Sequence, residues 1–103
     1  MKLEFSILQE FGQHLADGSR AAEFRMGRID PHMGICPEIV LDFTGVWAAN
    51  SSFINALVSS LVEQHGQRAL NILVFKGCNP VLRVLVEAAI ALGLPKANQL
   101  VRA

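Results

Sequence analysis

The stretch Leu41–Val58, LDFTGVWAANSSFINALV, changes its hydrophobic pattern at Asn50. Its first half continues a run of large and β-branched apolar residues, 38–46, which is typical of a strand covered on both faces in a parallel sheet. Its second half opens a stretch in which apolar residues recur at helical spacing, 51–65, and Gly66 then favours a helix end. We therefore expect a buried strand, a short loop and a helix, in that order.

The flanking segments extend this alternation of strands and helices. Residues 2–8 alternate between apolar and polar side chains, as in an edge strand, and residues 19–30 carry apolar side chains at helical spacing. A second apolar run, 70–76, predicts another buried strand, and 80–92 predicts a helix that ends at Gly93. We expect the tail after this helix either to add an edge strand or to trail.

The order strand–helix, repeated three times, predicts an α/β domain with helices packed on the sheet. We expect the strands at 38–46 and 70–76 to be parallel neighbours, so that the loops after them leave the sheet at the same end. Open α/β sheets form their binding crevices at that end. The loop WAANSS, 47–52, therefore lies where a functional site is expected.

Composition narrows the class of protein. The chain has 103 residues, enough for a single domain, 1–103, with a sizeable core. Apolar residues make up 51% of it, and nine basic residues balance nine acidic ones, so we expect no nucleic-acid partner. Arg83 and Glu87 interrupt the longest apolar region, so we expect no membrane span. With no targeting signal, and with Cys36 and Cys78 far apart, we expect a cytoplasmic protein with reduced thiols.

Asp42 is the one charged residue inside the apolar run that follows Glu38. A carboxylate at the end of a buried strand needs hydrogen-bond donors. We expect backbone N–H groups of the following loop to supply them. Asp42 and Gly45 are therefore expected to have a structural role and to fix the path of this loop.

Asn50, Ser51 and Ser52 stand where the helix begins. Asn and Ser are favoured N-cap residues because their side-chain oxygens accept hydrogen bonds from free helical N–H groups. One such residue is enough to cap the helix, so capping alone does not account for all three. A phosphate at this position would be stabilised by the positive end of the helix dipole. Ser51 and Asn55, four residues apart, share a polar face. Two interpretations remain open at this point: a helix start alone, and a phosphate acceptor at Ser51.

The same junction resembles the STAS domains of anti-sigma-factor antagonists and sulfate transporters, and especially their small STAS-like relatives. Their signature is a strand that ends in Asp, an aromatic residue or Leu, Ser or Thr, Gly and Val, followed after three residues by Asp-Ser-Ser-Gly at a helix start. This chain has DFTGV at 42–46 and NSSF at 50–53, with the same spacing, although Asn50 and Phe53 replace the usual Asp and Gly. The resemblance implies a STAS-like layered domain with helices packed on a mixed sheet.

The resemblance also implies a switch between protein partners. In the antagonists, a kinase of the GHKL ATPase type phosphorylates the first serine of the pair, which corresponds to Ser51 here. The implied protein is a non-catalytic regulatory module with a GHKL-type ATPase or kinase as its partner. The expected interaction surface consists of Trp47, Asn50, Ser51, Ser52, Phe53 and Asn55.

Other chemistry is not indicated by the sequence. The neighbours of Ser51 do not form the GxSxG turn of a serine hydrolase. The histidines lie in separate segments, whereas a metal site needs convergent ligands. We therefore expect no enzymatic activity, no metal and no cofactor. The alternative, from another functional class, is a domain that senses a small anion or nucleotide at the N-terminus of the same helix.

Overall fold

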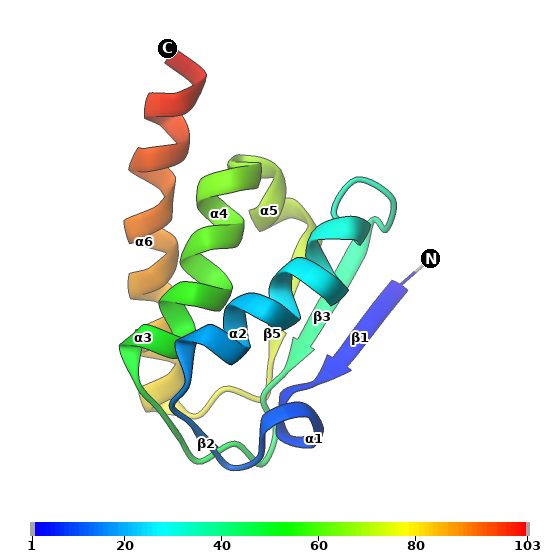
Figure 1. The fold of residues 1–103 in the computed structure, drawn as a ribbon, viewed down its shortest axis with the longest axis vertical. Coiled ribbons are helices and arrows are strands. Elements are labelled where there is room, and N and C mark those ends of the chain that lie inside the picture. Colours follow the sequence, from blue (N-terminus) through cyan, green and yellow to red (C-terminus); the bar gives the residue numbers. More distant parts are fainter. Residues whose placement is uncertain (1, 103) are drawn as a thin grey trace.

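The computed structural model describes the backbone of residues 2–102 and the side chains of residues 2–95. Three strands form the main sheet. β3 (Glu38–Asp42) lies in the centre, with β1 (Lys2–Ser6) on one side and β5 (Leu73–Lys76) on the other (Figure 1). The expected parallel pairing of β3 with the strand that follows it is confirmed, and so is the edge position of β1.

A second, shorter pair of strands lies outside the main sheet. It joins β2 (His14–Leu15) to β4 (Ala48–Ala49), and this pair is also parallel. All strand pairings in the described part of the chain are therefore parallel, where a mixed sheet was expected. The α/β class itself, with helices packed on the sheet, is confirmed.

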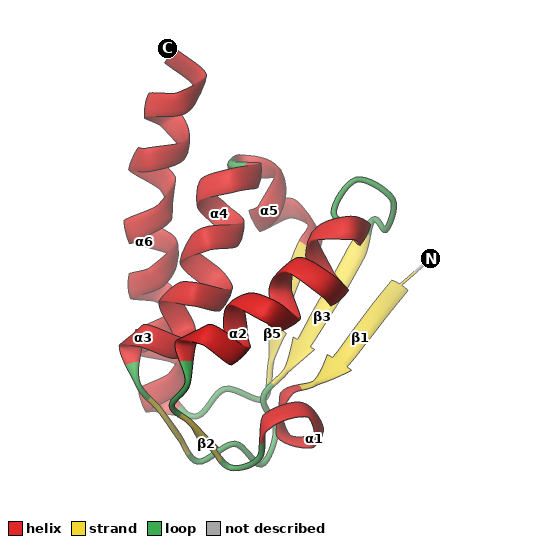
Figure 2. Ribbon diagram, in the orientation of Figure 1, coloured by secondary structure: helices red, strands yellow, loops and turns green. Residues whose placement is uncertain are grey.

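The helices lie together on one side of the main sheet, so the domain has two layers (Figure 2). In chain order the helical segments are α1 (Ile7–Phe11), α2 (Gly18–Phe24), the π-helix η1 (Arg25–Ile29), the 3₁₀ helix η2 (Asp30–His32), α3 (Ser51–Ile54), the π-helix η3 (Asn55–Ser59), α4 (Ser60–His65), α5 (Gln67–Ile72) and α6 (Pro80–Arg102).

The core fills the space between the two layers. Leu3, Ile39 and Leu73 are aligned across the three strands. Ile39 and Leu73 belong to the buried apolar cluster, and the partly buried Leu3 packs against it. From the helix layer, Ile54 and Leu82 are fully buried in the same cluster. The sheet register therefore follows from the alternation of apolar residues along each strand.

The outer face of the sheet differs from the expected arrangement, in which β3 has apolar cover on both faces. Val40 is only 3% exposed, and its neighbours across the sheet are Glu4 on β1 and the exposed Val74 on β5. The Lys2 ammonium lies 3.9 Å from Glu4 and 4.0 Å from Glu38, and Lys76 lies 3.9 Å from Glu4. These exposed pairs contribute little stability each, and they keep the open face of the sheet polar.

The helix predicted over 51–65 forms as one continuous helical stretch, made of α3, η3 and α4. It ends at Gly66, which has a φ of 65°. The first predicted helix also forms, because α2 continues into η1 as far as Ile29. Changes of hydrophobic period thus located both helices.

Several boundaries were predicted wrongly. The first strand, predicted over 2–8, ends at Ser6, where α1 follows. The run 70–76 was expected to be a strand throughout, but α5 extends to Ile72 and β5 begins only at Leu73. The run 38–46 leaves the sheet after Asp42. Short apolar runs do not distinguish a buried helical turn from a strand, and here the buried Ala69 anchors α5 to the core.

Gly93 was expected to end the last helix, yet α6 continues through it and through Pro95 to Arg102. A Cβ at Gly93 would lie 2.6 Å from the Ser59 carbonyl oxygen and 3.0 Å from Val62 Cβ. The glycine therefore allows α6 to approach η3 and α4 closely. The tail predicted to be an edge strand or to trail has a helical backbone through Arg102.

Candidate functional site

The Asp42 side chain shapes the loop that follows β3. Its Oδ1 atom accepts hydrogen bonds from the Thr44 N–H at 2.9 Å and the Thr44 hydroxyl at 2.6 Å. These bonds, with the hydroxyl first, lower the pKa of Asp42, and the nearby Lys76 ammonium acts in the same direction. The predicted backbone hydrogen bond to this carboxylate is confirmed.

Two glycines allow the loops after β3 and β5 to pack tightly. Gly45 has a φ of 86°, and a Cβ there would lie 2.7 Å from Leu8 Cδ2. Gly77, in the loop after β5, has a φ of 72°, and a Cβ there would meet the backbone of Thr44 at 2.7 Å. Both positions favour glycine on conformational and on steric grounds. The loops therefore leave the sheet together, at its carboxyl end.

The chain then runs beside the segment that contains His14. The Trp47 N–H donates to the Gln13 carbonyl at 2.9 Å, and the Asn50 N–H donates to the Leu15 carbonyl at 2.9 Å. The Trp47 side chain is 71% exposed and meets the His14 ring edge-on, with 5.5 Å between ring centres. A shallow hollow of about 200 Å³ lies between these two short strands.

Asn50 caps the helix that begins at Ser51. Its Oδ1 accepts from the Phe53 N–H at 2.8 Å, while its Nδ2 donates to the Ala16 carbonyl at 2.8 Å. A carboxylate could make the first of these bonds but has no N–H for the second. The amide at position 50, where the STAS signature has Asp, thus ties the helix start to the neighbouring strand.

Ser51 and Ser52 are both exposed at the first two positions of α3. Ser52 lies against the start of α2, since a Cβ on Gly18 would come within 2.8 Å of the Ser52 hydroxyl. Asn50, Ser51, Ser52 and Trp47, together with the shallow hollow beside them, are called the junction surface below.

Two residues that the sequence predicted to lie on the interaction surface are not part of the junction surface. Phe53 is 1% exposed, and its ring packs edge-on against Phe11 with 4.9 Å between ring centres. The expectation that Phe53 contacts a partner was therefore wrong. The phenyl ring that replaces the usual glycine is buried in the core. Asn55 is half-buried at the start of η3.

Sequence reasoning missed a cluster of polar side chains around the buried Arg25 and the partly buried Asp30. Arg25 is 6% exposed, and its Nη1 lies 2.7 Å from Asp30 Oδ2. His65 Nε2 lies 3.2 Å from the other oxygen of Asp30, which links the end of α4 to η2. Arg25 and Arg28, three residues apart, have the spacing of a solvated helix face, and nothing in the sequence indicates that Asp30 also contacts His65. The described residues contain no group of three or more His, Cys, Asp or Glu side chains placed to hold a metal ion.

The parallel sheet, the loop held by Asp42 and the helix start at Asn50 together define a STAS-like domain. The chain belongs to the family described as the STAS-like domain of unknown function (DUF4325), whose family model matches residues 21–82. That match contains β3, the whole junction, β5 and the start of α6. No curated protein and no solved structure matches the chain. In the part of the chain that the structure describes, no helix combines the length and hydrophobicity needed to cross a membrane.

Proposed function

We propose that this protein is a regulatory interaction module without catalytic activity, and that phosphorylation of Ser51 switches its binding to a protein partner. The observation that carries the proposal is the place of Ser51. Its side chain is exposed at the first residue of a long helical stretch, and Asn50 already provides the cap of that helix. The Ser51 hydroxyl is therefore available for modification without loss of the helix start.

A phosphate on Ser51 would be well accommodated electrostatically. It adds about −1.5 to −2 charges beside the positive end of the helix dipole. Phe53 and Ile54, which follow Ser52, are buried in the core. They anchor the helix independently of the Ser51 hydroxyl. Modification would change the charge of the junction surface while the fold stays intact.

The remainder of the junction surface suits a protein partner. Trp47, four residues before Ser51 in the chain, is an exposed large apolar side chain of this loop. Tryptophan is enriched among residues that dominate binding energy at interfaces. The shallow hollow beside it offers a place for a partner side chain. A GHKL-type ATPase or kinase is the partner that the STAS resemblance favours. A small anion at the same helix start is less favoured, because Asn50 already occupies the Phe53 N–H.

The absence of catalysis is part of the proposal. A serine nucleophile needs a base within hydrogen-bond reach. Among the described side-chain hydrogen bonds, none joins Ser51 to a histidine or a carboxylate. The proposal therefore assigns Ser51 as a substrate for another enzyme.

The test is an affinity pull-down from the native cell, followed by titration of the isolated partner against each variant. We expect Ser51→Asp to change the partner's binding free energy by about 1 kcal/mol or more, because a new charge inside an interface is rarely neutral. Trp47→Ala should weaken binding by about 2 kcal/mol. Ser51→Ala should keep the fold and the binding of the unmodified protein.

Gln67→Asp is the matched control. Gln67 is exposed at the first residue of α5, near the opposite end of the molecule from the junction surface (Figure 1). This variant adds the same charge at another helix start. If Ser51→Asp and Gln67→Asp both bind the partner as the wild type does, the proposal is wrong and the serines serve only as part of a helix start.

A further inference from the structure

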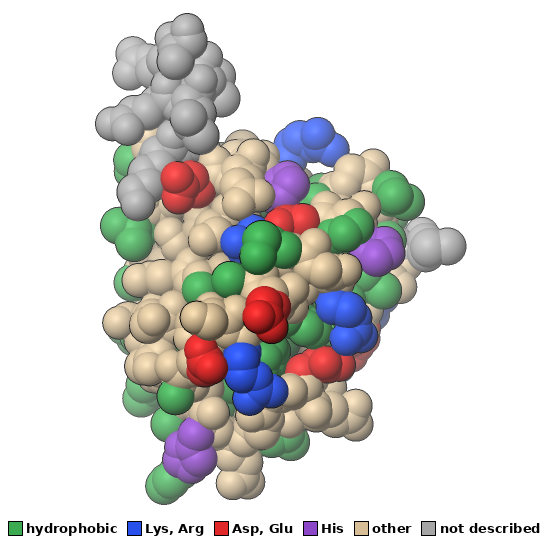
Figure 3. Space-filling view, viewed as in Figure 1, with side chains coloured by type: hydrophobic (Ala, Val, Ile, Leu, Met, Phe, Trp, Pro, Cys, Tyr) green, Lys and Arg blue, Asp and Glu red, His purple; other side chains and the backbone are tan. Residues whose placement is uncertain are grey.

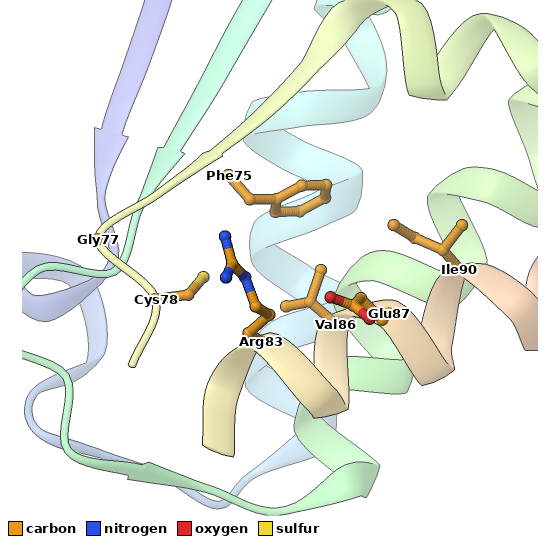
Figure 4. Close-up of a pocket in the computed structure, with 7 residues that line it drawn as sticks. All are labelled: Phe75, Gly77, Cys78, Arg83, Val86, Glu87 and Ile90. Atoms are coloured by element: carbon orange, nitrogen blue, oxygen red, sulfur yellow. The ribbon is translucent and has the colours of Figure 1, made fainter. Parts of the chain in front are cut away.

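A cavity of about 340 Å³ lies between β5 and α6, next to the loop that follows β5 (Figure 4). Its apolar wall is formed by Phe75, Val86 and Ile90. Its position beyond the carboxyl end of a parallel strand is the usual place for a ligand in an open α/β sheet. The volume falls at the low end of the range of small-molecule pockets, which suits a small ligand.

Two opposite charges line this cavity from the same helix. Arg83 and Glu87 stand four residues apart on α6, and both side chains are exposed. No salt bridge within residues 2–95 includes either of them, although their spacing places them on one helix face. Figure 4 shows the Arg83 guanidinium directed toward Phe75 and Cys78, away from Glu87. The cavity thus presents a separate cation and anion beside an apolar wall.

Cys78 lies at the same end of the cavity as the Arg83 guanidinium. Burial raises the pKa of the Cys78 thiol, and the positive charge of Arg83 opposes this effect only in part. The thiol is therefore protonated and neutral near pH 7. Arg83 has no thiolate beside it to neutralise its charge.

We propose that this cavity binds an α-amino acid with an apolar side chain. The carboxylate pairs with Arg83, the ammonium group pairs with Glu87, and the side chain covers Phe75, Val86 and Ile90. A simple carboxylate would place an anion close to Glu87, and a simple amine would place a cation close to Arg83. A zwitterion carries an anion for Arg83 and a cation for Glu87. Its net charge is zero, as is the net charge of Arg83 and Glu87 together.

The direct test is titration of the ¹⁵N-labelled protein with L-leucine, L-methionine and L-phenylalanine, observed by amide chemical shifts. We expect saturable shifts confined to the amides of residues 75–90. 4-Methylpentanoate lacks the amino group of leucine, and 3-methylbutylamine lacks its carboxylate. Each should bind about tenfold more weakly than L-leucine, because one charge-assisted contact is lost. The proposal is overturned if none of the three amino acids binds, or if either analogue binds as tightly as L-leucine.

Charge-removing variants locate the site. Arg83→Gln and Glu87→Gln should each weaken L-leucine binding by about tenfold. Arg68→Gln and Glu23→Gln remove exposed charges from α5 and α2, away from the cavity, and should bind as the wild type does. Equal effects of the cavity variants and the control variants would overturn the proposal. Ser51→Ala should leave binding unchanged, so this result is independent of the proposed switch.

Discussion

At the scale of single residues, the Asp42 carboxylate decides how the chain leaves β3. The two hydrogen bonds from Thr44 lower its pKa below the ordinary value of 3.8. A carboxylate with a lowered pKa in the folded state holds its proton less tightly there than in the unfolded chain. It therefore stabilises the fold fully above its ordinary pKa, and this stabilisation is lost as the pH falls through the lower, folded value.

We predict that Asp42→Ala lowers the free energy of unfolding by about 1 kcal/mol at neutral pH, the typical contribution of such hydrogen bonds. The difference from the wild type should begin to shrink as the pH falls below 3.8, where the unfolded chain takes up the proton. It should be lost once the pH passes the lower pKa of the folded state, where the wild-type carboxylate is protonated in both states. Urea denaturation at neutral and acidic pH measures both effects. Glu23→Ala, which truncates an exposed carboxylate on α2, is the control. Equal stabilities of the two variants at neutral pH would reject a structural role for Asp42.

At the scale of elements, the buried Arg25 joins two π-helical segments. In η3 the Ser60 N–H bonds to the Asn55 carbonyl, five residues back, and not to the Ala56 carbonyl, four residues back. The Ala56 carbonyl accepts instead from Arg25 Nε at 3.0 Å, and Arg25 itself lies in η1. Asp30 balances the charge of this arginine at 2.7 Å. The carbonyl that the wide turn of η3 leaves free thus accepts its hydrogen bond from a side chain of η1.

Removal of the Asp30 charge should be costly, because it leaves a buried guanidinium without its partner. The Arg25 side chain is 8% exposed, and we predict that Asp30→Asn lowers the free energy of unfolding by about 3 kcal/mol. The measurement is urea denaturation at neutral pH.

A more exposed pair, which joins η1 to α1, provides the control. Arg28 and Glu10 lie 3.4 Å apart, with side chains 53% and 32% exposed. Glu10→Gln should change the free energy of unfolding by less than about 1 kcal/mol. If both variants lose the same stability, the contacts around Asp30 do not hold η1 and η2 to η3 and α4.

At the scale of the whole molecule, local sequence signals located the layers and their contact points. The change of period after Asn50 predicted the junction, and the parallel pairing of β3 and β5 followed from the order of elements. The Asp42 hydrogen bond was predictable because a lone carboxylate at a strand end needs a nearby donor. Each of these features depends on residues that are close together in the sequence.

Features that depend on distant contacts could not be predicted. In the sequence Gly93 is typical of a helix end, whereas in the structure it makes room for the Ser59 carbonyl. Phe53 was predicted to lie on the interaction surface, whereas in the structure its ring packs against Phe11. Arg25 belongs to a solvated face on spacing alone, whereas its partner carbonyl at Ala56 lies 31 residues away. The cavity at Arg83 likewise forms only when β5 and α6 are brought together.

The whole molecule supports one functional claim above the others: that its junction surface is switched at Ser51. The serine is exposed, its helix is capped by Asn50, and the exposed Trp47 stands four residues earlier in the same loop. These contacts distinguish Ser51 from Ser52, which lies over Gly18 at the start of α2. A kinase that binds the junction surface should therefore phosphorylate Ser51, the first serine of the pair.

The most direct measurement is phosphosite mapping by mass spectrometry of the protein isolated from its native cell, under conditions that preserve phosphate esters. The account predicts a peptide that spans the junction with its phosphate on Ser51, and no such peptide from a strain that carries Ser51→Ala. Full coverage of this peptide with Ser51 always unmodified, under conditions in which the partner is bound and in which it is released, would contradict the claim.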